Sequence, residues 1–99
     1  MKFQITLYLA LFSLLSFSQK AILEGIVTDQ TNKPIDGVTV SSSSIIFITG
    51  PDGKYTIELS PGRQSVTFYL YGYITQIKSI SASEKTKSTL DITLIEDVT

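Results

Sequence analysis

Residues 50–62, GPDGKYTIELSPG, decide the fold class of this chain. Residues 50–53 are a tight turn, because proline presets φ, aspartate accepts local backbone hydrogen bonds and glycine tolerates a positive φ. In residues 54–59 polar and apolar side chains alternate, which is the two-residue period of a strand with one buried face. Residues 60–62, Ser-Pro-Gly, supply the next reversal. The turn at 50–53 is therefore expected to join two neighbouring antiparallel strands.

Short β-branched and aromatic segments recur on both sides of this stretch, separated by turn-forming residues. The six further predicted strands are Ile22 to Thr28, Gly37 to Ser42, Ile45 to Thr49, Val66 to Tyr71, Ile74 to Ile80 and Leu90 to Ile95. Residues 81–88 are polar and are expected to form a loop, and no helix of three turns fits the pattern. The sequence thus predicts an all-β fold, a seven-stranded antiparallel β-sandwich.

Composition restricts the functions that the chain can perform. Its 99 residues, 42% apolar and 17% charged, can hold one modest domain. Eight basic and nine acidic residues give a formal net charge of −1, which provides no basic field for nucleic acid. The chain has no Cys and no His, which removes disulfides, thiolate nucleophiles, imidazole bases and nearly every zinc or copper site. We therefore expect no enzymatic activity, no cofactor and no nucleic-acid partner.

The first 18 residues differ from the rest and are predicted to be a signal peptide. Lys2 precedes an apolar run from Phe3 to Phe17, which is shorter than the ~20 residues that span a bilayer. Ser16 and Ser18 are small residues at the −3 and −1 positions of a cleavage site before Gln19. Residues 19–99 then form the β-sandwich domain, without a transmembrane segment. This domain is expected to be secreted across the inner membrane to the periplasm or the outer membrane, and a retained anchor is the alternative.

Five ordered motifs resemble the carboxypeptidase-regulatory-like domain of Bacteroidetes envelope proteins, over about residues 22 to 95. They are Leu23-x-Gly25-x-Val27-x-Asp29, Lys33-Pro34-Ile35-x-Gly37-Val38-x-Val40, Thr49-x-x-Asp52-Gly53-Lys54-Tyr55, Pro61-Gly62 and Tyr71-Gly72-Tyr73. The resemblance implies a transthyretin-like sandwich of Greek-key type. It also implies a setting such as the periplasmic N-terminal extension of TonB-dependent outer-membrane receptors, including those of the starch-utilisation type.

Two features of the sequence depart from this family. Gly50 follows the threonine of the third motif, where the family usually has an acidic residue, and residues 41–47, SSSSIIF, replace its usual loop rich in glycine and threonine. A membrane barrel of eight strands at about 10 residues each does not fit within the chain. The chain is therefore expected to be a stand-alone copy of the domain or the N-terminal portion of such a receptor.

The turn residues of these motifs are interpreted as structural. This set comprises Gly25, Asp29, Pro34, Gly37, Asp52, Gly53, Gly62 and Gly72. Isolated aspartates in turns normally bind their own backbone, and Asp29 lacks the continuation of a calcium loop, so no metal site is expected. The serine run 41–44 has no base to activate a nucleophile and is expected to be a polar loop.

Two groups of exposed side chains are the candidate partner contacts. Residues 45–48 are four consecutive large apolar residues, and they predict either an edge strand that pairs with another protein or a strand buried on both faces. Strand alternation places Tyr69, Tyr71 and Tyr73 on one face and Phe68 in the core. The candidate contacts are therefore Ile46, Phe47, Ile48, Tyr69, Tyr71 and Tyr73.

These observations favour a non-catalytic docking or accessory module associated with TonB-dependent nutrient uptake, with a protein partner in the cell envelope. The alternative is a free-standing carbohydrate- or surface-binding module, because tyrosine combines an apolar face with a hydrogen-bonding tip. A third class is an enzyme, since the transthyretin-like fold also includes a hydrolase of 5-hydroxyisourate. That hydrolase depends on histidines, which this chain lacks.

Overall fold

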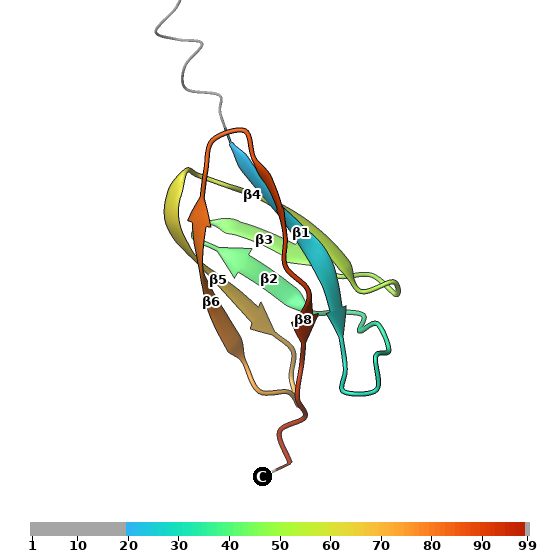
Figure 1. The fold of residues 1–99 in the computed structure, drawn as a ribbon. Coiled ribbons are helices and arrows are strands. Elements are labelled where there is room, and N and C mark those ends of the chain that lie inside the picture. The colour runs from blue at the N-terminus through green and yellow to red at the C-terminus, as the bar shows by residue number, and fades with distance from the viewer. Residues whose placement is uncertain (1–19, 99) are drawn as a thin grey trace, which may run out of the picture.

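The computed structural model describes residues 20–98, which form two facing β-sheets (Figure 1). The strands are β1 Ala21–Thr28, β2 Thr39–Ser42, β3 Ile45–Ile48, β4 Lys54–Leu59, β5 Gly62–Tyr69, β6 Gln76–Ala82, β7 Lys87–Thr89 and β8 Ile92–Thr93. One sheet has the order β4-β1-β7, with β8 also paired to β1, and the other has the order β3-β2-β5-β6. The predicted all-β sandwich is confirmed, with eight strands rather than seven.

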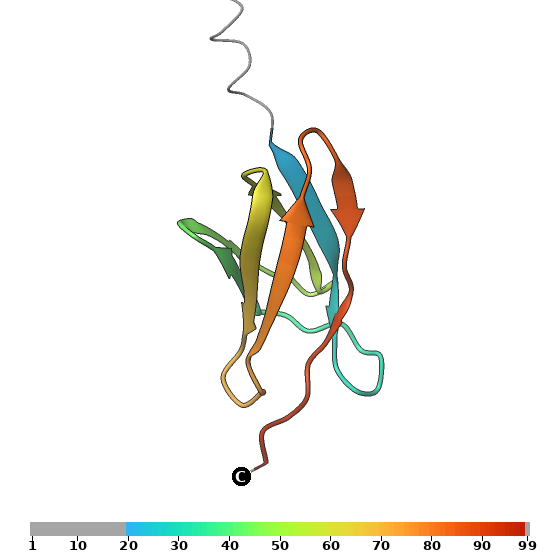
Figure 2. The same ribbon diagram turned by 60° about the vertical axis from the view of Figure 1, so that its left-hand side comes forward.

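The core lies between the two sheets and follows from the alternation in the sequence. In β4, Tyr55, Ile57 and Leu59 are buried while the residues between them are exposed. Val66 and Phe68 of β5 are fully buried and face them from the other sheet. Figure 2 shows the two layers, with β5 and β6 in one and β1 and β7 in the other. Burial of these apolar faces is the main force that holds the sheets together.

Strand β1 is the centre of the first sheet and has neighbours of both directions. It pairs antiparallel with β4, and parallel with β7 and β8. The sequence predicted a loop over residues 81–88 and one strand over 90–95. Instead, β6 continues to Ala82, and the C-terminal segment forms two short strands interrupted at residues 90 and 91. The predicted loop is therefore correct only for residues 83–86. Its two ends belong to strands, because polar exposed residues at a sheet edge can still join the ladder.

The turn at residues 50–53 is correctly predicted, but the strands that it joins are not hydrogen-bonded neighbours. The N–H of Gly53 donates to the carbonyl of Gly50 at 2.9 Å, which closes the turn. Strand β3 before it belongs to one sheet and β4 after it belongs to the other. The Gly53 carbonyl accepts the N–H of Val27 at 2.8 Å, so the chain leaves the turn alongside β1. The expectation of an antiparallel hairpin at this turn is wrong for this reason.

The hairpin of the second sheet lies between β2 and β3, around residues 43 and 44. Ser42 pairs with Ile45 across this two-residue loop, and Ser43 has a positive φ of 52°. Such a loop normally contains a residue with positive φ, because that matches the twist of the flanking strands. The serine run therefore forms a hairpin turn, and it places β3 at the edge of its sheet.

Thr49 anchors the start of β2 to the end of β3. Its buried hydroxyl donates to the Ile35 carbonyl at 2.8 Å and accepts the Val38 N–H at 3.0 Å. Its backbone carbonyl accepts the N–H of Gly37, whose φ is +81°. Gly37 and Val38 thus both lie opposite Thr49 of the neighbouring strand segment, as in a β-bulge. The positive φ explains why glycine occupies position 37.

Candidate functional site

The outer face of the first sheet is charged. Lys54 and Glu58 of β4, Glu24 of β1 and Lys87 of β7 all lie on this sheet with exposed or partly exposed side chains. Glu24 and Lys87 form an ion pair at 2.8 Å, which raises the pKa of Lys87. Ile22 and Ile26 of β1 lie on the same face, where they pair with Glu58 and Lys54, so charged side chains flank every apolar one.

The outer face of the second sheet is partly apolar, and its charged side chain is Arg63 near the start of β5. The ladder aligns Ile48 with Thr39 and Tyr69 in one row, and Ile46 with Ser41, Thr67 and Ile77 in the next. Paired residues of neighbouring strands share a face, so these seven side chains form one surface. We call this surface the outer patch. Its four large members are all exposed, Ile46 at 66%, Ile48 at 62%, Tyr69 at 48% and Ile77 at 67%.

The outer patch crosses the whole sheet from the edge strand β3 to the edge strand β6. Its large apolar side chains lie at the two edges and on β5, and β-branched or small hydroxyl residues lie between them. Exposed apolar residues that occur singly need no explanation, but several on one sheet face mark an interaction surface. The outer patch is therefore the candidate functional site.

The structure separates the three candidate contacts of β3. Ile46 and Ile48 lie on the outer patch, whereas Phe47 is partly buried and packs against the core. The four apolar residues of β3 therefore follow ordinary strand alternation, with an apolar residue on each face. The run of residues 45–48 was correctly interpreted as an edge strand, but Phe47 does not belong to its exposed face.

The three candidate tyrosines do not form one platform. Strand β5 ends at Tyr69, and the Tyr73 N–H donates to the Leu70 carbonyl at 3.0 Å across a turn. Tyr71 is in this turn and is 88% exposed, while Tyr73 is partly buried against the core. The turn contains Gly72 with a φ of +91°, so strand alternation does not extend beyond Tyr69. The expectation that the three rings share one face is wrong, and only Tyr69 belongs to the outer patch.

Ile77 was not among the predicted contacts, although its segment was predicted as a strand. Ile77 and Ile80 are three positions apart, so they lie on opposite faces of a strand, and alternation does not indicate which of the two faces is buried. The register decides, because Ile77 pairs with Thr67 on the outer face while the partly buried Ile80 packs against the core. A short strand without clear alternation gives no sequence signal for this choice.

The first sheet carries two open depressions near Tyr55. They measure about 350 and 330 Å³ and share Glu24, Lys54 and Tyr55 in their lining. The Tyr55 hydroxyl donates to the Leu90 carbonyl at 2.5 Å, and burial raises the pKa of this phenol. Tyr55 thus serves as an anchor for the C-terminal segment.

The carboxylates of Asp29 and Asp52 accept hydrogen bonds from their own loops. One carboxylate oxygen of Asp29 accepts the Thr31 hydroxyl at 2.7 Å and the backbone N–H groups of Thr31 and Lys33 at 2.8 and 3.0 Å. These bonds, that of the Thr31 hydroxyl first, lower the pKa of Asp29. Asp52 similarly accepts the Lys54 N–H at 3.1 Å. Residues 20–98 contain no group of three His, Cys, Asp or Glu that could hold a metal ion.

The remaining turn motifs also have local structural roles. Pro34 forms an isolated bridge with Thr28, and it lies 3.0 Å from where a Cβ on Gly53 would be. Gly62 begins β5 with a φ of +111°, a conformation that L side chains rarely adopt.

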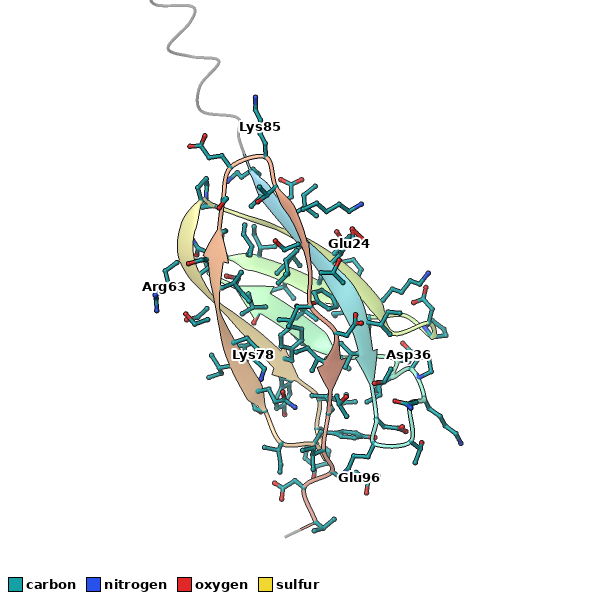
Figure 3. The ribbon with its side chains drawn as sticks, viewed as in Figure 1. Glu24, Asp36, Arg63, Lys78, Lys85 and Glu96 are labelled. Atoms are coloured by element: carbon teal, nitrogen blue, oxygen red, sulfur yellow. The ribbon has the colours of Figure 1, made fainter. Side chains whose placement is uncertain are left out.

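Charged side chains are dispersed rather than gathered. Figure 3 shows Arg63 beside β5, Lys85 on the loop after β6, Asp36 on the loop after β1 and Glu96 near the C-terminus, well apart from one another. No patch of one sign is formed by these residues, so the uncharged outer patch is the more distinctive surface. In the part of the chain that the structure describes, no helix has the length and apolarity needed to cross a membrane.

Fold and site define a small β-sandwich module with a charged face on one sheet and the uncharged outer patch on the other. The chain belongs to the family of the carboxypeptidase regulatory-like domain, whose model matches residues 22–95. Domains of this family are non-catalytic modules.

Individual proteins that are similar to this chain are longer, and they contain the domain as one part. A viral protein, "Structural protein 27" (virus isolate Australia/Victoria), is 32% identical over 78 residues, which cover 79% of this chain and 15% of that protein. The TIE protein of Bacillus anthracis has a TM-score of 0.66 at 16% identity, over 79% of this chain and 17% of that one. Catechol 1,2-dioxygenase of Acinetobacter radioresistens has a TM-score of 0.66 at 12% identity, over 87% of this chain and 55% of that one. At such identities the solved structures share the fold alone.

Proposed function

We propose that this chain is a docking module of the bacterial cell envelope, which binds a protein of TonB-dependent outer-membrane uptake through the outer patch. The observation that carries this proposal is the contrast between the two sheet faces. On one face charged side chains flank the apolar residues of β1. On the other, the outer patch exposes Ile46, Ile48, Tyr69 and Ile77 with only Thr and Ser between them, and the charge of Arg63 lies beyond the patch at the start of β5. An uncharged sheet surface with an aromatic residue has the composition of the core of a protein interface.

A flat sheet surface suits a protein better than a small ligand. Small-molecule sites are concave and bury most of their ligand, whereas the outer patch is the open face of a four-stranded sheet. A sugar platform would need several aromatic rings side by side, and the tyrosines of this chain are divided between the sheet, a turn and the core. The outer patch therefore favours the protein partner over carbohydrate.

The envelope setting of the proposal is supported by the sequence of residues 1–18, whose apolar run and small residues before Gln19 are typical of a signal peptide. This segment lies outside the described residues. The receptor association is supported by the resemblance of the motifs to domains of TonB-dependent receptors.

Binding to the purified TonB-dependent receptors of the producing strain tests the proposal. We expect Ile77→Lys to weaken binding by about tenfold or more, because a charge buried within an apolar interface must be desolvated. Thr56→Lys is the matched control, since Thr56 is exposed on the outer face of the other sheet. Absence of receptor binding, or equal weakening by both variants, would overturn the proposal. Glycan-array binding that depends on Tyr69 would instead favour the carbohydrate-binding alternative.

A further inference from the structure

Strand β3 is an edge strand without the usual protection against pairing. Native sheets commonly protect their edges with charged side chains or proline. The other long edge strands of the described residues follow this rule, with Lys54 and Glu58 in β4, Lys78 in β6 and Lys87 in β7. By contrast, β3 reads Ile-Ile-Phe-Ile, and residues 37–51 around it contain no charged side chain.

The free backbone groups of β3 belong to Ile46 and Ile48. The Thr49 N–H donates to the Val38 carbonyl at 3.0 Å, so Thr49 directs its backbone groups toward β2. Hydrogen-bonded and open positions alternate along an antiparallel strand. Ile45 and Phe47 therefore also bond to β2, while Ile46 and Ile48 direct their N–H and C=O groups to the open edge. Figure 2 shows the β2–β3 hairpin, in green, on the side of the molecule away from β1 and β7.

These open positions are symmetric about Phe47, which makes the edge complementary to itself. We propose that β3 pairs antiparallel with β3 of a second copy of this chain, about a two-fold axis that passes beside Phe47. In this register Ile46 of each copy faces Ile48 of the other, and each such pair exchanges two hydrogen bonds. The four-stranded sheets of the two copies then form one continuous sheet, and closed two-fold pairing ends at a dimer.

The side chains fit this pairing as well as the backbone does. On the outer face, the two Ile46–Ile48 pairs join the outer patches of the two copies into one apolar surface. On the inner face the two Phe47 rings meet, and each Phe47 lines the open depression of about 350 Å³ next to Gly50 and Tyr55, which leaves space for the second ring. No charge of the segment 37–51 opposes the approach, because it contains none.

This self-complementarity favours a second copy over a strand of a different protein. Any extended strand presents open backbone groups at the same spacing, so the side chains decide. A second copy sets isoleucine against isoleucine and Phe47 against Phe47, with no charge opposed. The proposal goes beyond receptor docking, since the outer patch remains exposed in the dimer and a monomer could equally bind a receptor.

Sedimentation equilibrium of the purified full chain from about 1 µM to about 1 mM tests the dimer. We expect a reversible monomer–dimer equilibrium without larger species. Ile46→Lys should weaken dimerisation by about tenfold or more, because it places a charge on the pairing edge. Ile77→Lys is the matched control, because Ile77 is equally exposed on the same face at the opposite edge strand, β6. This control should dimerise like the unmodified chain, although it should lose receptor binding.

Two further variants keep the test independent of side-chain effects. Ile46→Pro removes a donor that faces the open edge and no hydrogen bond to β2, so the variant should stay folded by circular dichroism and be monomeric. Phe47→Cys, in a chain without other cysteines, should form a covalent dimer under mild oxidation, while Ile77→Cys should not. A monomer at every concentration, equal weakening by Ile46→Lys and Ile77→Lys, or cross-linking at residue 77 but not at residue 47 would each overturn the proposal. A dimer unaffected by Ile46→Pro would overturn it too.

Discussion

Phe68 is the largest fully buried side chain of the described residues. Its ring meets that of Tyr55 edge to face, with centroids 5.3 Å apart at an angle of 74°. Since Phe68 belongs to one sheet and Tyr55 to the other, this contact joins the two layers. Aromatic pairs of this geometry stabilise beyond the area that they bury.

Phe68→Ala should lower the free energy of unfolding by about 3–5 kcal/mol, because it removes buried surface and leaves a cavity between the sheets. Urea denaturation followed by circular dichroism measures the change. Tyr69→Ala is the control. The Tyr69 side chain follows Phe68 in the chain but is half exposed on the outer patch, so its loss should lower the free energy of unfolding much less. A denaturation midpoint unaffected by Phe68→Ala would contradict the strand register.

Asp29 gives the loop after β1 a dependence on pH. Hydrogen bonds from Thr31 and Lys33 favour the ionised carboxylate and lower its pKa from the ordinary value of 3.8. A carboxyl whose pKa is lower in the folded state stabilises the fold above its unfolded pKa, and this contribution is lost as pH falls through the folded pKa.

We therefore expect Asp29→Asn to reduce the loss of stability between neutral pH and pH values below 3.8. The amide oxygen of asparagine can still accept the loop hydrogen bonds but does not titrate in this range. Urea denaturation of both proteins across this pH interval provides the measurement. Parallel pH dependences in the two proteins would show that Asp29 contributes nothing to acid sensitivity.

At the scale of elements, the close contact between β1 and the C-terminal segment explains why the last predicted strand is interrupted. A Cβ on Gly25 would lie 2.0 Å from the carbonyl oxygen of Leu90, so only glycine fits there. The Leu90 carbonyl accepts the Tyr55 hydroxyl, and the Asp91 carboxylate accepts the Ile26 N–H at 3.0 Å. Together with the backbone bond from the Leu90 N–H to the Glu24 carbonyl at 2.8 Å, these side-chain bonds hold residues 90 and 91 against β1, between β7 and β8.

Gly25→Ala should consequently displace the C-terminal segment and destabilise the domain by more than the usual ~1 kcal/mol of a point substitution. The opposing atom is backbone and cannot rotate away. Hydrogen exchange should show lost protection in β7 and β8 before the rest of the fold. Gly50→Ala is the matched control, because a Cβ at that position meets nothing closer than 3.9 Å. Similar effects of the two substitutions would contradict the close approach.

Alternation along the chain was sufficient to predict the buried faces of β1, β2, β4 and β5, but it could not predict which strands are neighbours. The turn at 50–53 has the residues of a hairpin turn, yet the strand that follows it pairs with β1. The Gly53 carbonyl accepts the N–H of Val27, which lies much earlier in the chain. The same limit applies to the site. Ile46 and Ile48 were predicted as contacts from their apolar run, whereas Ile77 could be assigned to the outer patch only from its pairing with Thr67 in the structure.

At the scale of the whole molecule, all the described strands lie within residues 21–93. Ala21 already pairs with Leu59 and is buried. Cleavage between Ser18 and Gln19 would therefore leave both sheets complete. A domain of about 80 residues without disulfides buries a limited fraction of its surface, so losing an element of either sheet would be costly.

We propose that the protein is exported and that the exported form begins at Gln19. Mass spectrometry of the periplasmic and outer-membrane fractions should find this form, because the apolar run of residues 3–17 is too short for a stable anchor and ends in small residues. Ser18→Arg should block processing, since a large charged residue does not fit the small-residue position before the cleaved bond. Ser60→Arg, in the exposed turn before β5, should leave it unchanged. Recovery of the unmodified chain with Met1 still attached in the inner membrane would show instead that residues 1–18 are retained as an anchor.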